Sequence, residues 1–185
     1  MKITIISGSP RLESTTFRVA AYLQKYFPAH YAAHEFTLVD VRDYPLPFVQ
    51  NVFGSVAETQ PQWKPLAEIM FSSDAFVLVT PEYNGGYSPA MKNLLDHFPK
   101  QMKKVFGMAT ASPGAMGGMR AAQQMQQMVC AFFGIPCPNM LLVPAVDKKF
   151  NVQNELTDAD FEKSIAAFAK EFIWLAEAVH QKKNG

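Results

Sequence analysis

The chain has 185 residues, of which 49% are hydrophobic and 18% are charged, and this composition excludes an intrinsically disordered or fibrous protein. Seventeen Lys and Arg residues nearly balance sixteen Asp and Glu residues, so the formal net charge is only +1. Without a net charge or a block of like charges, we expect neither a nucleic-acid partner nor membrane insertion. A chain of this length predicts one domain spanning residues 1–185.

The N-terminal apolar run ends before Pro10 and Arg11, so it is too short for a signal peptide or a membrane span. We therefore predict a cytoplasmic protein. Cys130 and Cys137 have neither zinc-site nor redox-motif spacing. We expect both cysteines to be reduced and packed in the interior.

Short apolar runs predict β-strands at residues 3–6, 36–39, 75–79, 105–111 and 140–143. The runs are continuous rather than alternating, which indicates strands that are covered on both faces. Longer stretches with helical spacing separate them. This rhythm is typical of an α/β protein with a mostly parallel sheet.

The helical stretches lie around residues 18–27, 62–71, 88–95, 121–132 and 157–179. Ser88 and Pro89 have the residue types of an N-cap and a first-turn proline. Thr157 and Asp160 predict a capping box at the last helix. Residues 42–61 have no strong periodicity, and we interpret them as a loop over the sheet rather than a domain linker.

The first predicted strand runs directly into residues 7–16, at the edge where open α/β sheets bind ligands. A helix N-terminus favours an anion, and Arg11 adds a full charge. Hydroxyl donors come from Ser9, Ser14, Thr15 and Thr16. The loop therefore predicts a site for a terminal monophosphate. The alternative is that Ser14 or Thr15 only caps the helix and that Arg11 is solvated, and the negative charge of Glu13 counts against an anion site.

Two further loops follow the third and fourth predicted strands. Residues 80–89 contain Tyr83, Tyr87 and the pair Gly85-Gly86, which frees the backbone to fold beneath a flat ligand. An ordinary strand-to-helix turn is the alternative for this segment. Residues 110–120, after the fourth predicted strand, contain three glycines and several small side chains, so we expect a flexible loop there too. Three such loops at one edge of the sheet predict a ligand site at a topological switch point.

These loops resemble motifs of the NADPH-dependent FMN reductase family, a branch of the flavodoxin-like proteins that includes bacterial quinone, chromate and azo-dye reductases. Gly8-Ser9-Pro10-Arg11-x-x-Ser14 is similar to its phosphate loop. Pro81-Glu82-Tyr83-Asn84 followed by Lys92-Asn93 resembles its PEYN…KN signature. Ser112-x-Gly114-x-x-Gly117-Gly118-x-Arg120 resembles its third loop, so the resemblance spans about residues 3–120.

The resemblance implies an α/β fold, namely a flavodoxin-like three-layer sandwich. Its parallel sheet would have five strands in the order 2-1-3-4-5, with helices on both faces. FMN would bind non-covalently at the C-terminal edge, with its phosphate at the first loop and its isoalloxazine ring between the second and third. The cofactor-binding residues that the resemblance implies are Ser9, Arg11, Ser14, Thr15, Thr16, Pro81, Glu82, Tyr83, Asn84, Ala111 and Ser112.

The resemblance further implies an FMN-dependent NAD(P)H oxidoreductase. In a ping-pong exchange, hydride would pass from NADPH or NADH through FMN to a small acceptor, such as a quinone, a flavin, an azo compound or a metal oxyanion. The cofactor carries this chemistry, so we predict no catalytic side chain. His30, His34 and His180 lack ligand spacing, and we predict no metal site.

Asp96 and His97 lie on the predicted third helix, which often packs in a dimer interface in this family. We expect these two side chains on the helix surface or in the interface of a homodimer or homotetramer. Fifteen Phe and ten Met residues are an unusual supply of soft apolar side chains. Met91, Met116 and Met119 lie beside the ligand loops, and we predict that they form an adaptable wall for flat acceptors.

Two other functions stay open on the sequence. A flavodoxin-type electron carrier would bind the same FMN but act on protein partners. Such carriers are usually strongly acidic, whereas this chain is almost neutral. A phosphate-binding module without a redox role would bind no flavin at all.

Overall fold

The computed structural model describes residues 1–184, with side chains through residue 182. A parallel sheet forms the middle layer, and its strands are β1 (Lys2–Ser7), β2 (Glu35–Asp40), β3 (Ala75–Pro81), β4 (Val105–Ser112), β5 (Ile135–Pro136) and β6 (Leu141–Pro144). The α-helices are α1 (Thr15–His30), α2 (Lys64–Ser72), α3 (Pro89–Asp96), α4 (Met119–Ala131), α5 (Val146–Lys149) and α6 (Glu162–Asn184). Short 3₁₀ turns, η1 (Pro61–Trp63) and η2 (Ala159–Phe161), precede α2 and α6.

The strand order is β2-β1-β3-β4-β5, which confirms the predicted topology. At the edge of the sheet next to β4, two short strands replace the single strand expected at residues 140–143. There β5 pairs with the start of β4, and β6 pairs with its end. Pro136 and Pro138 lack the N–H that a continuous ladder needs, so the chain leaves the edge of β4 and returns to it.

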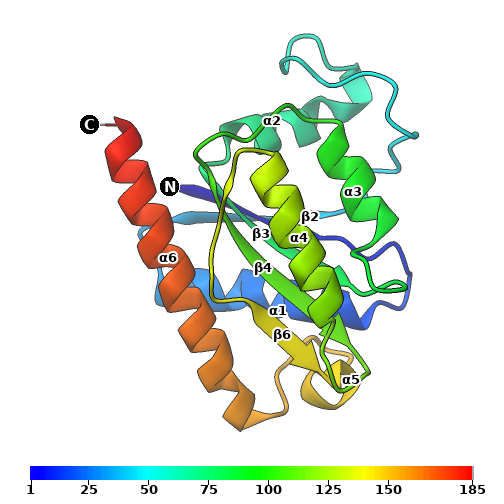
Figure 1. Cartoon of the computed structure of the whole chain (residues 1–185), viewed down its shortest axis with the longest axis vertical. Coiled ribbons are helices and arrows are strands. Elements are labelled where there is room, and N and C mark those ends of the chain that lie inside the picture. Colours follow the sequence, from blue (N-terminus) through cyan, green and yellow to red (C-terminus); the bar gives the residue numbers. More distant parts are fainter. Residues whose placement is uncertain (185) are drawn as a thin grey trace.

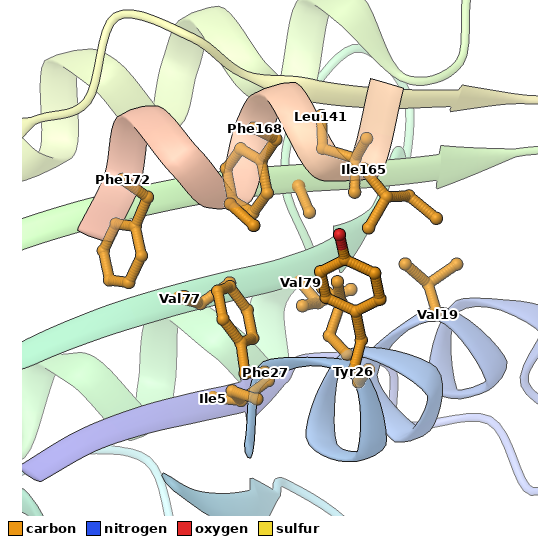
Figure 2. Close-up of a cluster of buried hydrophobic side chains, with 14 of the residues drawn as sticks. Ile5, Val19, Tyr26, Phe27, Val77, Val79, Leu141, Ile165, Phe168 and Phe172 are labelled. Atoms are coloured by element: carbon orange, nitrogen blue, oxygen red, sulfur yellow. The ribbon is translucent and has the colours of Figure 1, made fainter. Parts of the chain in front are cut away.

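Helices cover both faces of the sheet (Figure 1), as predicted. On one face, α1 and α6 enclose a core rich in aromatic rings; Figure 2 shows Phe27, Phe168 and Phe172 lying between these helices and the strands. The rings of Phe27 and Phe172 are 6.0 Å apart. On the other face, α2, α3 and α4 bury a second core that contains Met70, Met91 and several other methionines.

Capping side chains set the start of two helices. The Ser88 hydroxyl accepts a hydrogen bond from Met91 N at 3.0 Å, so the predicted cap of α3 is confirmed. The capping box predicted from Thr157 is wrong. Thr157 is held by the neighbouring turn, where its hydroxyl donates to the carbonyl of Lys148, and Asp158 caps η2 instead by accepting from Phe161 N at 3.3 Å.

The long segment between β2 and α2 folds against α3. The Asn93 side chain holds it by donating to the Pro47 carbonyl at 2.9 Å and accepting from Val49 N at 3.3 Å. The segment also covers His97, which is 3% exposed and lies beside Phe53. The prediction that His97 lies on the surface of its helix or in an interface is therefore wrong. The sequence did not show this burial, because the covering segment is irregular and has no pattern that reveals its path.

The two cysteines differ in burial. Cys137 is buried as predicted, and burial raises the pKa of its thiol. Cys130 is exposed, so its predicted packing is wrong. It lies on α4 away from the buried stripe of Ala121, Met125 and Val129. Within the described residues, no helix combines the length and the apolar character needed to cross a bilayer.

Candidate functional site

Three loops meet at the carboxyl ends of the strands: loop 1 (residues 8–14) after β1, loop 2 (residues 82–88) after β3, and loop 3 (residues 113–118) after β4. They surround a cavity of about 210 Å³. The sequence-predicted residues that line it are Ser9, Arg11, Ser14, Thr15, Thr16, Pro81, Glu82, Tyr83, Ala111 and Ser112. Asn84 is exposed at the tip of loop 2 and does not line the cavity. Glu13 and Pro113 join the lining without having been predicted.

Loop 1 leads into the N-terminus of α1. The Ser14 hydroxyl accepts from Phe17 N at 3.0 Å, so the capping role considered for Ser14 is observed. Its hydroxyl hydrogen is still available to a ligand oxygen, because the cap uses Ser14 only as an acceptor. The first-turn N–H groups beside it give this end of the cavity a partial positive charge.

Two more hydroxyls reach the same end of the cavity. Ser9 and Thr16 are only 2% and 3% exposed, and neither hydroxyl forms a hydrogen bond within the described part of the chain. Arg11 is exposed, with its guanidinium 5.0 Å from the centre of the Tyr83 ring. No carboxylate within residues 1–182 pairs with Arg11. Unpaired donors and an uncompensated cation suit an anionic group such as a phosphate.

Loop 2 is tied to loop 1 through α3. Ser88 N donates to Thr80 Oγ1 at 3.1 Å, and the Ser88 hydroxyl donates to the carbonyl of Gly8. Gly8 N in turn donates to the Val79 carbonyl at 2.8 Å. A Cβ on Gly8 would lie 2.9 Å from Met91 Cβ, an atom close to the backbone of α3, so the close approach of loop 1 to α3 favours glycine.

The contact between Gly8 and Met91 bears on the prediction that three methionines form a wall for acceptors. Met91 is fully buried beneath Gly8 and cannot touch an acceptor, so its predicted role in that wall is wrong. A sequence does not show which residue packs under a glycine three elements away. Met116 is 55% exposed in loop 3, and Met119 is half-buried at the start of α4.

Within loop 2, a tight turn presents the backbone to the cavity. Tyr83 N donates to the Gly86 carbonyl at 2.8 Å, and Gly86 N donates back to the Tyr83 carbonyl at 3.0 Å. Asn84 and Gly85 adopt positive φ angles of 51° and 85°, which is the conformation of a two-residue type I′ hairpin turn. The Tyr83 hydroxyl is buried without a hydrogen-bond partner among the described residues. A buried polar atom of this kind favours a ligand or water partner.

Glu82 has a role that the sequence did not reveal. Its Oε2 accepts from Arg120 N at 3.2 Å and from Ala121 N at 3.4 Å, and its Oε1 lies 3.7 Å from the Arg120 guanidinium. The carboxylate thus caps α4, whose own N-cap residue is Gly118. Glu82 therefore joins loop 2 to the end of loop 3. The sequence held one signal for this role: the helix starts after Gly117-Gly118, and glycine has no side chain to cap it, so a cap from elsewhere in the chain was to be expected.

Loop 3 is held by hydrogen bonds between its own residues and the end of β4. The Thr110 hydroxyl donates to the Gly117 carbonyl at 2.7 Å, and the Ser112 hydroxyl accepts from Gly114 N at 3.1 Å. Gly118 has a φ of +86°, and a Cβ there would lie 2.8 Å from Thr110 Cβ. The Thr110, Ser112 and Glu82 side chains are thus occupied in holding the loops. Backbone, Pro81, Ala111 and the Tyr83 hydroxyl, which is unpartnered within the described residues, remain to contact a ligand.

Solved structures share this fold along nearly the whole chain. The flavoenzyme NAD(P)H:(acceptor) oxidoreductase FerB from Paracoccus denitrificans superposes with a TM-score of 0.70 at 21% identity, covering 97% of both chains. An oxidoreductase from Corynebacterium diphtheriae gives a TM-score of 0.73 at 15% identity, again over 97% of both chains. A flavodoxin mutant from Pseudomonas aeruginosa gives 0.59 at 23% identity, covering 93% of this chain and 99% of its own. These similarities confirm the predicted flavodoxin-like fold.

Sequence comparison identifies the family. The FMN-dependent NADPH-azoreductase of Staphylococcus aureus (strain USA300) is 27% identical over 180 residues, which is 94% of each chain. The family model for NADPH-dependent FMN reductase matches residues 1–147. This match confirms the family indicated by the loop motifs, and with it an oxidoreductase class that uses FMN and NADPH. The chain belongs to the NADPH-dependent FMN reductase family.

Proposed function

We propose that this chain passes hydride from NADPH or NADH, through non-covalently bound FMN, to a small acceptor by a ping-pong mechanism. The observation that carries the proposal is the division of the cavity between loops 1, 2 and 3. Arg11 and the hydroxyls of Ser9 and Thr16 lie at one end, and Tyr83, small apolar side chains and backbone lie at the other. An elongated ligand with a terminal phosphate and a planar ring matches this division, and part of it would extend beyond the cavity of about 210 Å³.

At the phosphate end, we propose that Ser9, Arg11, Ser14, Thr15 and Thr16 bind the FMN phosphate. Arg11 supplies the charge and a forked set of donors, whereas the hydroxyls and the N-terminus of α1 supply neutral donors. Glu13 also lines the cavity and adds a negative charge. This charge opposes an anion, so Arg11, the hydroxyls and the N-terminus of α1 must outweigh it if a phosphate is to bind.

At the ring end, we propose that residues 81–84 line one side of the isoalloxazine and that Ala111 and Ser112 bound the other. FMN, when bound, supplies a ring that accepts hydride and passes it on. The protein orients the ring through backbone groups that the hairpin turn of loop 2 holds in place. Glu82 is occupied in capping α4, which supports a positioning role rather than that of a general base.

The acceptor class follows the same reasoning. We propose a quinone, a free flavin, an azo compound or a metal oxyanion, and the name of the Staphylococcus aureus relative makes an azo compound the first to test. A flavodoxin-type carrier would need a charged docking surface for protein partners. The net charge of +1 favours a small acceptor instead.

Initial rates test the ping-pong proposal. We expect NADPH oxidation by the FMN-loaded protein to depend on an azo dye or a quinone, with parallel double-reciprocal plots as both substrates are varied. Intersecting plots would contradict the ping-pong order. Turnover only with an added redox protein would favour the carrier alternative.

We also propose that residues 1–185 form one FMN-binding domain and that it assembles as a homodimer or homotetramer through α3 and α4. These helices border a groove of about 390 Å³ that contains apolar Met128 and Phe132 beside charged Lys92 and Asp96. Mixed apolar and polar lining of this kind is typical of subunit interfaces. Sedimentation equilibrium over a range of concentrations checks the assembly, and a monomer at all of them would contradict it.

A further inference from the structure

Arg42 follows β2 and crosses over to loop 1. The last residues of β1 and β2, Ser7 and Asp40, are paired in register, and Val41 N donates to the Ser7 carbonyl at 3.0 Å. The segments after the two strands therefore leave the sheet side by side. This places Arg42 next to the loop for which we propose phosphate binding.

The guanidinium of Arg42 is fixed on its own side by Asp40. Arg42 Nε donates to both carboxylate oxygens at 3.0 Å, and Nη2 donates to Oδ2. The Asp40 side chain is 6% exposed, so this ion pair is largely shielded from solvent. The hydrogen bond to Asp40 also raises the pKa of Arg42, so its charge is retained.

The other edge of the guanidinium holds loop 1. Arg42 Nη1 donates to the Leu12 carbonyl at 2.9 Å and approaches the Arg11 carbonyl at 3.4 Å. Its carbon centre lies 4.4 Å from the centre of the Phe17 ring in the first turn of α1. One side chain thus contacts both the loop and the helix whose N-terminus borders the cavity.

Loop 1 has little else to fix its middle. Within the described residues, no other hydrogen bond reaches the backbone of residues 9–13. The Leu12 side chain is 89% exposed and does not anchor the loop by packing. Arg42 itself lies outside the lining of the cavity.

We infer that Arg42, held by Asp40, is a positioning residue that sets the affinity for the FMN phosphate by fixing the backbone of Arg11 and Leu12. The inference rests on the proposed FMN site. It assigns Arg42 no contact with the ligand, because its charge is balanced by Asp40 and its donors are used within the protein. Fixing the loop lowers the entropy that is lost when the phosphate binds.

The Asp40→Asn variant separates positioning from direct charge. If Arg42 positions the loop, weakening its ion pair releases Arg42, and the FMN Kd rises. If Arg42 instead attracts the phosphate through its charge, the loss of the compensating carboxylate leaves the FMN Kd unchanged or lowers it. The two roles therefore predict opposite directions for one substitution.

The experiment titrates the apoprotein with FMN and with riboflavin and follows quenching of flavin fluorescence. We expect Arg42→Ala and Asp40→Asn each to raise the FMN Kd about 10-fold while riboflavin binding is unchanged, since riboflavin lacks the phosphate. Arg42→Lys should resemble Arg42→Ala, because an ammonium cannot span Asp40 and Leu12 as a fork does. Lys25→Ala removes an equal charge from an exposed position of α1 and should leave the FMN Kd unchanged.

A rise in the FMN Kd for Arg42→Ala but not for Asp40→Asn would overturn the inference, as would unchanged FMN binding in both. Amide hydrogen exchange of residues 9–13 in the apoprotein gives a readout without flavin. The Arg42 and Asp40 variants should exchange faster there, and unchanged exchange would also count against the inference. If the wild-type protein binds no FMN, the proposed function fails, whereas the exchange data still decide whether Arg42 fixes the loop.

Discussion

The two ends of the cavity use their polar side chains differently. At the end formed by loop 1, the hydroxyls of Ser9 and Thr16 and the Arg11 guanidinium have no hydrogen-bond or ion-pair partner within the described residues. At the end formed by loops 2 and 3, Thr80, Ser88, Thr110 and Glu82 are all hydrogen-bonded to the protein itself. The loop 1 end is therefore suited to bind an anionic group, and the end formed by loops 2 and 3 is suited to keep a fixed conformation.

This contrast explains how one small cavity would hold FMN without a catalytic side chain. The phosphate would receive specific charged and hydroxyl contacts. The ring would meet a backbone surface that is rigid because Thr80, Ser88, Thr110 and Glu82 are already hydrogen-bonded, with the Tyr83 hydroxyl left unpartnered within the described residues. Substitutions at the first end should discriminate between FMN and riboflavin. Substitutions at the second end should affect the fold and both flavins alike.

The largest effect is expected for Gly118→Ala in loop 3. The positive φ of +86° and a Cβ only 2.8 Å from Thr110 Cβ both oppose a side chain there. We expect urea unfolding to show a loss of about 2–4 kcal/mol in the free energy of unfolding, with weaker binding of both flavins. Gly114→Ala is the matched control, because its Cβ would meet Ser112 Oγ at an ordinary 3.4 Å. Equal stability of the two variants would refute the rigid-loop account.

Arg11→Ala should have the next largest effect, and on FMN alone. Loss of a charged donor should raise the FMN Kd about 10- to 100-fold, while riboflavin binding stays unchanged. Arg11→Lys should fall between the wild type and the alanine variant, because an ammonium keeps the charge but not the fork. Flavin fluorescence titrations measure all four constants. Similar losses for both flavins would show that Arg11 does not act on the phosphate.

Glu82→Ala should lower stability by about 0.5–2 kcal/mol, the usual cost of losing a helix cap. Glu82→Gln keeps an oxygen that can accept from Arg120 N and Ala121 N, so it should lose less. Urea unfolding of the two variants gives the comparison. If glutamine and alanine are equally destabilising, then the charge and not the hydrogen bond holds loop 2 against α4.

Single hydroxyl deletions at the two ends should give the smallest effects. Ser9→Ala should raise the FMN Kd about three- to tenfold and leave riboflavin unaffected. Ser112→Ala is the counterpart at the other end; its hydroxyl already accepts from Gly114 N, so the ratio of FMN to riboflavin affinity should not change. A change in that ratio for Ser112→Ala would remove the distinction between the two ends.

The topology could be predicted because each strand is a continuous apolar run and each helix has its own periodicity. The loops of the site could be found for the same reason: they follow strands whose carboxyl ends meet at one edge. The split of the fifth position into β5 and β6 was not visible, since both segments are too short to show a period.

The roles of Glu82, Asn93 and Arg42 could not be predicted from local patterns. The partners of Glu82 lie 38 or 39 residues away along the chain, and those of Asn93 lie 44 to 47 residues away. The loop 1 partners of Arg42 lie 30 or 31 residues away. Strand pairing and helix packing bring these groups together, and no spacing rule describes such contacts. Cys130 shows the reverse error, in which a general preference for buried cysteine outweighed the helical position that placed it outside.

Anaerobic titration of the FMN-loaded protein with NADPH tests the central claim most directly. We predict that the apoprotein binds FMN stoichiometrically and that one equivalent of NADPH bleaches the visible absorption band of the flavin, with colour restored by an azo dye or a quinone. A protein that binds no FMN, or whose bound FMN is not bleached by NADPH or NADH, would contradict the account.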